Sequence, residues 1–204
     1  AMGEKKGRVA LLMGCVQSVL DPGINAATLR LLTRLGYEVV VSGEETCCGS
    51  LTHHMGKETD ALTRVRGSID QWTDANVDAV IITASGCGTT VKDYGHLLAR
   101  DPAYAQRAAV ILALTKDVSE FVSSHDIGAP QRWTSLKVAY HSDCSMQHGQ
   151  RIIDPPRSPT MLGEKPPPAR RREQRGLDRP VLGVAVVRIG RLRVAQGSHQ
   201  KARC

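Results

Sequence analysis

The chain has 204 residues, a hydrophobic content of 41% and a formal net charge of +7. This length suits one medium-sized domain with a core, or such a domain followed by a tail. The positive charge belongs to residues 153–204, which hold twelve Lys or Arg and four Asp or Glu, whereas residues 1–152 hold fifteen and sixteen. A nucleic-acid-binding surface is therefore not expected on the body of the chain. No apolar run approaches the ~18 residues of a transmembrane helix.

Strands and helices are predicted to alternate along the first three quarters of the chain. Continuous apolar runs such as residues 8–13 are typical of strands buried in a parallel sheet, and apolar residues at helical spacing indicate helices. The predicted strands are residues 8–13, 38–41, 78–83 and 136–140; the predicted helices are residues 24–35, 57–76 and 89–98, and a helix in two pieces from 101 to about 123. This order predicts an α/β fold, with an open, mostly parallel sheet flanked by helices and right-handed crossovers.

Residues 153–204 differ in character from the rest of the chain. They hold seven of the ten prolines and the run Arg170-Arg171-Arg172, and they show no usable periodicity. A segment of this composition cannot easily bury a core, so we expect a disordered C-terminal tail. We therefore divide the chain into a cysteine-bearing module at 1–152 and a Pro/Arg-rich tail at 153–204. The abrupt change is what a shifted reading frame would produce, so the tail is expected to be non-native or disordered.

Adjacent cysteines form the most unusual feature of the sequence, at Cys47-Cys48-Gly49. Neighbouring Cα atoms are ~3.8 Å apart, which is shorter than the usual Cα separation of a disulfide, so a bond between these two is not expected. The N-terminus does not have the pattern of a secretory signal, and clustered cysteines in the cytosol indicate metal or redox chemistry. Cys204 is interpreted as an accident of the tail.

The other cysteines follow predicted strands. Cys15, Cys87 and Cys144 each come after an apolar run, and the carboxyl ends of parallel strands share one edge of a sheet, where ligand sites form. Helix N-termini after Cys15 and Cys87 would favour thiolates, and thiolates bind iron–sulfur clusters. Glycines beside the cysteines allow the backbone to approach a bound group closely; they are Gly14, Gly49, Gly86 and Gly88. Lys92 and Tyr94 are expected to be surface residues of a helix.

These residue types leave three kinds of site open. Four thiolates could hold an iron–sulfur cluster, or they could close a tetrahedral structural zinc site. Alternatively, the vicinal cysteines could be a redox pair that reacts with another disulfide.

Five motifs together resemble the cysteine-rich (CCG) domain family. They are Cys-Val-Gln at 15–17, Asn-Ala-Ala-Thr at 25–28, Cys-Cys-Gly-Ser-Leu-Thr-His-His at 47–54, Ser-Gly-Cys-Gly-Thr-Thr at 85–90 and His-Ser-Asp-Cys-Ser-Met-Gln-His at 141–148. This domain occurs in heterodisulfide reductase, in lactate and glycerol-3-phosphate oxidising systems and, with the greatest resemblance here, in the iron–sulfur subunit of bacterial glycolate oxidase. The family usually carries the module twice, and Cys144 matches the first cysteine of a second copy. It could be a fifth ligand of the first site, a ligand of a second site, or a free cysteine.

The resemblance implies an electron-transfer subunit of a glycolate oxidase or dehydrogenase complex. Its implied cofactor is an iron–sulfur cluster of the [4Fe-4S] type, with metal ligands Cys15, Cys47, Cys48, Cys87 and Cys144 and no catalytic residue in this chain. FAD is expected in a partner subunit that oxidises glycolate to glyoxylate, and a membrane acceptor would receive the electrons. The implied location is the cytoplasm, with a peripheral position at the inner face of the membrane as the alternative.

The alternative within the same family is a module like that of heterodisulfide reductase. There the vicinal cysteines would act on a substrate disulfide. The stretch Cys87-Gly88-Thr89-Thr90 lacks the second cysteine of the C-x-x-C found in that group, which favours the glycolate oxidase type.

Overall fold

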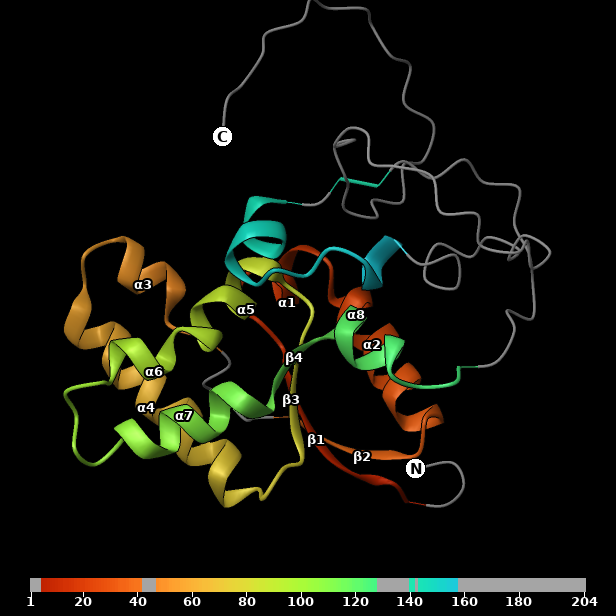
Figure 1. The fold of residues 1–204 in the computed structure, drawn as a ribbon, viewed down its shortest axis with the longest axis horizontal. Helices are drawn as coiled ribbons and strands as arrows, with labels where there is room; N and C mark the ends of the chain where they lie inside the picture. Colours follow the sequence, from red (N-terminus) through yellow and green to blue (C-terminus); the bar gives the residue numbers. More distant parts are fainter. Residues whose placement is uncertain (1–4, 42–46, 128–139, 142, 158–204) are drawn as a thin grey trace, which may run out of the picture.

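A four-stranded parallel sheet lies between two layers of helices in the computed structural model, which describes residues 5–41, 47–127, 140–141 and 143–157 (Figure 1). The strand order is β2-β1-β3-β4. The strands are β1 (Gly7–Leu12), β2 (Tyr37–Val41), β3 (Ala79–Ile82) and β4 (Thr115–Asp117). The helices are α1 (Gln17–Leu20), α2 (Pro22–Arg34), α3 (Ser50–His54), α4 (Glu58–Asp74), α5 (Ser85–Lys92), α6 (Tyr94–Leu97), α7 (Ala105–Leu114), α8 (Val118–Ser123), the π-helix η1 (Ser145–Gly149) and the 3₁₀ turn η2 (Pro155–Arg157). The predicted α/β class is confirmed.

Strand β1 is the centre of the sheet. It pairs in parallel with β2 through the register Val9↔Val39 and with β3 through Leu11↔Ile81. Its residues Val9, Ala10 and Leu11 have no exposed surface. A strand covered on both faces needs apolar side chains at successive positions, which explains the continuous apolar run of β1.

Two apolar clusters pack on opposite faces of the sheet. On one face, side chains of β1 and β3 such as Ala10 and Ile82 pack with α4, α5 and α7 around Ile69 and Trp72. On the other face, Val9 and Ile81 pack with Leu32 of α2 and with Phe121 of α8. Figure 1 shows the same division, with α2 and α8 on one side of the strands and α4, α6 and α7 on the other.

The chain changes direction across the sheet between β1 and β3. From β1 it passes through α2 to β2 at one edge, and from β2 it returns through α4 to β3 on the other side of β1. In open parallel sheets, ligands bind outside the carboxyl ends of the strands at such a switch point. Cys15 follows β1 and Cys87 follows β3, so both lie at this place.

The fourth described strand was not predicted. Residues 101–123 were expected to be a helix in two pieces, but β4 lies between α7 and α8 and pairs with β3 through Ile82↔Asp117. Three residues are too few to show a period, and among the described residues β4 pairs with β3 alone. A capping box marks the start of α8, where Asp117 and Glu120 cap each other's backbone. This sequence feature could have shown that α7 and α8 are separate helices with β4 between them. The predicted strand 136–140 lies outside the described residues, apart from Tyr140.

Other helix boundaries also differ from the predictions. Helix α5 begins at Ser85, four residues before the expected start, and a break at Asp93 separates it from α6. The short helices α1 and α3 were not predicted. Of the tail at 153–204, only residues 153–157 are described, and the proposed boundary at 153 stays a prediction. None of the helices in the described part of the chain is long and apolar enough to cross a membrane.

The junction of β4 and α8 gives a pH-dependent stability. Burial raises the pKa of the Asp117 carboxyl above its ordinary value of 3.8, although hydrogen bonds from Ser119 oppose this shift. Above pH 3.8 the native chain then binds more protons at this site than the unfolded chain does, so its contribution to the free energy of unfolding falls as the pH rises through the raised value.

We expect Asp117→Asn to remove this pH dependence, because asparagine retains an oxygen that can accept the Ser119 N–H but does not titrate. Urea unfolding should show the stability of the variant, relative to the original chain, increasing between about pH 4 and about pH 7. The matched control is Asp74→Asn at an exposed position of α4. An equal pH trend in both variants would contradict the assignment.

Candidate functional site

Four cysteines approach one another at the carboxyl edge of the sheet, on three separate segments. Cys15 lies between β1 and α1 and is exposed, and Cys87 lies in the first turn of α5 and is half-buried. Cys47 is half-buried, whereas its neighbour Cys48 is 2% exposed and belongs to the same apolar cluster as α4 and α5. All four are free thiols. The prediction that residues distant in sequence meet at this edge thus agrees with where these four lie.

The four thiols form two hydrogen-bonded pairs. Cys15 pairs with Cys47, and Cys48 pairs with Cys87; Cys87 also lies within electrostatic range of Cys15 and Cys47. In the part of the chain that the structure describes, no three or more His, Cys, Asp or Glu side chains are placed as ligands of a metal ion. The arrangement is therefore a group of two thiol pairs.

The Cys48–Cys87 pair shares a proton unequally. The hydrogen bond to Cys87, together with burial, raises the pKa of Cys48, so this residue keeps its proton and donates it. The hydrogen bond from Cys48 lowers the pKa of Cys87. The position of Cys87 in the first turn of α5 also favours a thiolate, since the N-terminal end of a helix carries partial positive charge.

Backbone N–H groups supply further donors to the sulfur atoms. Although Cys15 is largely exposed, partial desolvation of its thiol is the first cause that raises its pKa, and Cys47 is the second. The backbone N–H of Val16 hydrogen-bonds to its sulfur and opposes the rise. The N–H of Ser50, at the start of α3, acts in the same way on Cys48. The N-cap residue of α1 and the first residue of α3 thus present their amides to the cysteines that precede them.

Tyr94 anchors the Cys47-Cys48 loop, and its role was not predicted. It was expected on a helix surface, but it is fully buried and its hydroxyl donates to the Cys48 carbonyl oxygen at 2.9 Å. Its ring stacks on Trp72 with 6.4 Å between centroids. Burial raises the pKa of the Tyr94 hydroxyl, so it remains a donor. Lys92 is also not a free surface residue, because it pairs with Glu120 at 2.7 Å.

A polar network joins the Cys15 loop to β3. Gln17 Nε2 donates to Asn25 Oδ1 at 2.6 Å and to Thr83 Oγ1 at 2.7 Å. Asn25, which is 1% exposed, in turn donates to the Met13 carbonyl at 2.8 Å. The sequence feature that could have indicated this network is Asn25, a polar residue on a helix whose neighbouring turns are apolar. The network holds the loop that carries Cys15 against the end of β3.

Two of the four predicted glycines lie in close contacts, Gly49 with the backbone of α4 and Gly88 with the end of a flexible side chain. Gly49 has φ +83°, and a Cβ there would lie 3.1 Å from the Ala61 carbonyl oxygen and 3.2 Å from Val65 Cγ2. A Cβ on Gly88 would lie 2.6 Å from Gln150 Nε2. Gly14 has φ +70° and loose surroundings, whereas a Cβ on Gly86 would meet nothing among the described residues.

Cys144, the fifth predicted ligand, is exposed and directly precedes η1. The segment after it packs on α5, since Ser145 Oγ donates to Ser85 Oγ at 3.0 Å. The structure thus places the Cys144 segment against the helix that carries Cys87.

Comparison with known proteins identifies a family and several relatives of this chain. The cysteine-rich domain family (CCG) matches residues 9–92. The chain is 38% identical over 150 residues to the glycolate oxidase iron-sulfur subunit of Escherichia coli (strain K12). The aligned region covers 72% of this chain and 37% of that protein. It is 33% identical over 150 residues to the probable glycolate oxidase iron-sulfur subunit of Bacillus subtilis (strain 168), again 72% of this chain, with 34% of that protein covered.

A further relative is lactate utilization protein A of Exiguobacterium sp., at 30% identity over 142 residues, with 68% of this chain and 57% of that protein covered. The chain spans little more than a third of the two glycolate oxidase relatives. No solved structure matches it.

The two left-handed glycines around α3 provide a matched test of the Cys47-Cys48 loop. Gly49→Ala and Gly56→Ala both force alanine into the left-handed region, at roughly 1–2 kcal/mol each. Only Gly49→Ala also drives a Cβ against α4, whereas nothing lies within 4 Å at Gly56. We expect Gly49→Ala to lower the free energy of unfolding by about 1–3 kcal/mol more than Gly56→Ala, measured by urea unfolding. Equal losses would show that the loop does not pack on α4.

Proposed function

Residues 9–92 belong to the cysteine-rich domain family (CCG), and from this premise we propose that Cys15, Cys47, Cys48 and Cys87 hold an iron–sulfur cluster of the [4Fe-4S] type. We propose Cys144 as a further metal ligand, in the role of the first cysteine of a second module.

The single observation that carries the proposal is the gathering of four free thiols from three segments at the switch point of the sheet. Thiolates are the ligands that iron–sulfur clusters select.

The surroundings of the thiols fit an anionic group. The N–H groups of Val16 and Ser50 point at the sulfur atoms of Cys15 and Cys48, and α5 directs its N-terminal end toward Cys87. Cys48 and Tyr94 belong to an apolar cluster, which would keep water away from one side of the site. When bound, the cluster would supply one-electron transfer at a potential that such hydrogen bonds and burial adjust.

The proposed role of the whole protein is electron relay. Its relatives are named as iron–sulfur subunits of glycolate oxidase. We propose that this chain accepts electrons from an FAD-containing partner subunit that oxidises glycolate to glyoxylate, and passes them toward a membrane acceptor. In this role the chain would be a non-catalytic subunit, located in the cytoplasm or peripherally at the inner face of the membrane.

A thiol–disulfide redox module is the second candidate, because Cys48 and Cys87 form a hydrogen-bonded pair in which one thiol has a lowered pKa. Its distinguishing result would be a covalent adduct of a substrate thiol with Cys48 or Cys87 after a chemical quench. An iron–sulfur relay forms no such adduct.

Anaerobic reconstitution of the full chain with iron and sulfide tests the cluster proposal. We expect a brown protein with about four irons per site and visible absorption that reduction bleaches. Cys15→Ser, Cys48→Ser and Cys87→Ser should each lose most of the iron, whereas Cys204→Ser, the matched control outside the described residues, should retain it. A colourless protein with one zinc per chain would contradict the proposal and favour a structural zinc site.

A further inference from the structure

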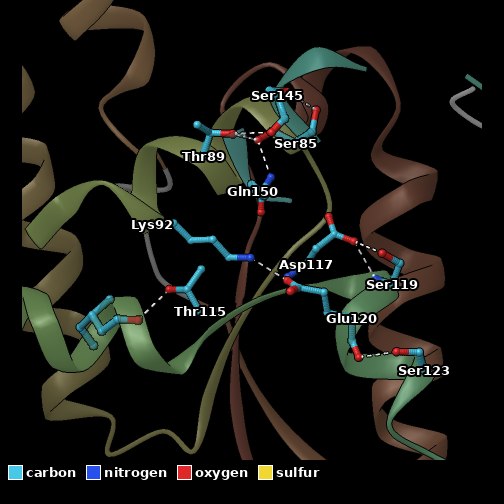
Figure 2. Close-up of polar contacts among 11 residues, drawn as sticks. Ser85, Thr89, Lys92, Thr115, Asp117, Ser119, Glu120, Ser123, Ser145 and Gln150 are labelled. Carbon is cyan, nitrogen blue, oxygen red and sulfur yellow. Dashed lines mark hydrogen bonds and ion pairs between the residues drawn. The ribbon is translucent and has the colours of Figure 1, made fainter. Parts of the chain in front are cut away.

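The segment that follows Cys144 is docked on the N-terminal turn of α5. Three hydrogen bonds join them: Ser145 Oγ to Ser85 Oγ at 3.0 Å, Thr89 Oγ1 to the Ser145 carbonyl at 3.2 Å, and Gln150 Nε2 to the Ser85 carbonyl at 2.8 Å. Figure 2 shows these side chains converging from η1 and α5. These hydrogen bonds therefore join two segments that are about 60 residues apart in sequence.

Gln150 touches this turn on both sides of Cys87. Its amide nitrogen donates to the carbonyl of Ser85, two residues before the cysteine. The same amide lies against Gly88, the next residue, so closely that a Cβ there would be 2.6 Å from Nε2 and 2.8 Å from Oε1. Gln150 Oε1 is buried and has no partner among the described residues. Its side chain is thus held by contact with α5.

The far end of the same helix is also fixed. Lys92, the last residue of α5, pairs with Glu120 Oε2 at 2.7 Å, and both side chains are about three-quarters buried. Glu120 in turn accepts the backbone N–H of Asp117 at 2.9 Å, which ties it to the end of β4 (Figure 2). Helix α5 is therefore restrained at its last residue by the sheet edge and at its first turn by Gln150 and Ser145.

We propose that Gln150 is a positioning residue for Cys87, and that the segment from Ser145 to Gln150 holds the first turn of α5 so that this thiol faces the other cysteines. This inference rests on the proposed role of Cys87 as a cluster ligand. It adds that the segment bearing Cys144 sets the geometry of the first site. Cys144 directly precedes Ser145, so a displacement of the backbone at this fifth cysteine would also move the first turn of α5, which carries Cys87.

Two substitutions disrupt the contact between Gln150 and α5, one on each partner. Gln150→Ala removes the side chain, and Gly88→Ala keeps it but displaces its amide, because the new Cβ occupies its place. Gly88 lies within α5 and has no positive φ, so alanine suits its backbone and favours the helix intrinsically. A shared effect of both variants would therefore come from the displaced amide. The control is Gln106→Ala at an exposed position of α7.

The first measurement needs no cluster. In the full chain without iron, the alkylation rate of each cysteine by iodoacetamide is followed by peptide mass spectrometry. We expect Gln150→Ala and Gly88→Ala to raise the rate at Cys87 several-fold, with a smaller change at Cys15. The double variant should equal Gln150→Ala alone, because Gly88→Ala acts by displacing a side chain that is then absent. Gln106→Ala should match the original chain.

The second measurement uses the reconstituted protein. We expect both variants to retain iron but to change the electron paramagnetic resonance spectrum and the reduction potential, which a loss of stability alone would not alter. Unchanged alkylation at Cys87 together with an unchanged spectrum would overturn the inference. If the original chain takes up no iron, the proposed function fails, whereas the alkylation rates still decide whether Gln150 positions Cys87.

Discussion

Parallel pairing of β1 with β3 is the constraint on which the rest of this structure depends. The register Leu12↔Ile82 brings both strands to an end at the same edge, so the loops that follow them start side by side. Residues 72 positions apart, Cys15 and Cys87, can meet there only because the two strands run in the same direction. The Gln17 hydrogen bonds to Asn25 and Thr83 then hold the loop after β1 against the end of β3.

Around this edge, short helices position the thiols more than the sheet itself does. Helices α1, α3 and α5 each begin near a cysteine, and the amides of Val16, the N-cap residue of α1, and Ser50, the first residue of α3, hydrogen-bond to sulfur atoms. Short helices have little stability of their own, so each must be held by tertiary contacts. Tyr94 performs this role for the Cys48 backbone. At α5 it is performed by the segment around Gln150, which lies near the C-terminal end of the described residues.

The order of elements and the candidate cysteines could be predicted, since long apolar periods and adjacent cysteines are local features of the chain. Strand β4 could not, because three residues carry no period and its pairing with β3 is a nonlocal contact. Helix α5 begins earlier than the sequence predicts, because Ser85-Gly86-Cys87-Gly88 has low helix propensity, which contacts from Ser145 and Gln150 override. The burial of Tyr94 is likewise not predictable from the sequence, because it depends on Trp72 and the Cys48 carbonyl, both distant in sequence.

By itself, the sequence determined the α/β class, the sites at which the chain turns after each apolar strand, and the cysteine pattern of the CCG family. These are properties of short stretches, because burial on a parallel sheet and thiolate chemistry each need particular residue types at nearby positions. The tertiary structure alone decided which thiols pair, which of them is buried and which segment holds α5. Those outcomes depend on contacts between residues distant in sequence, and such contacts form only when the chain folds.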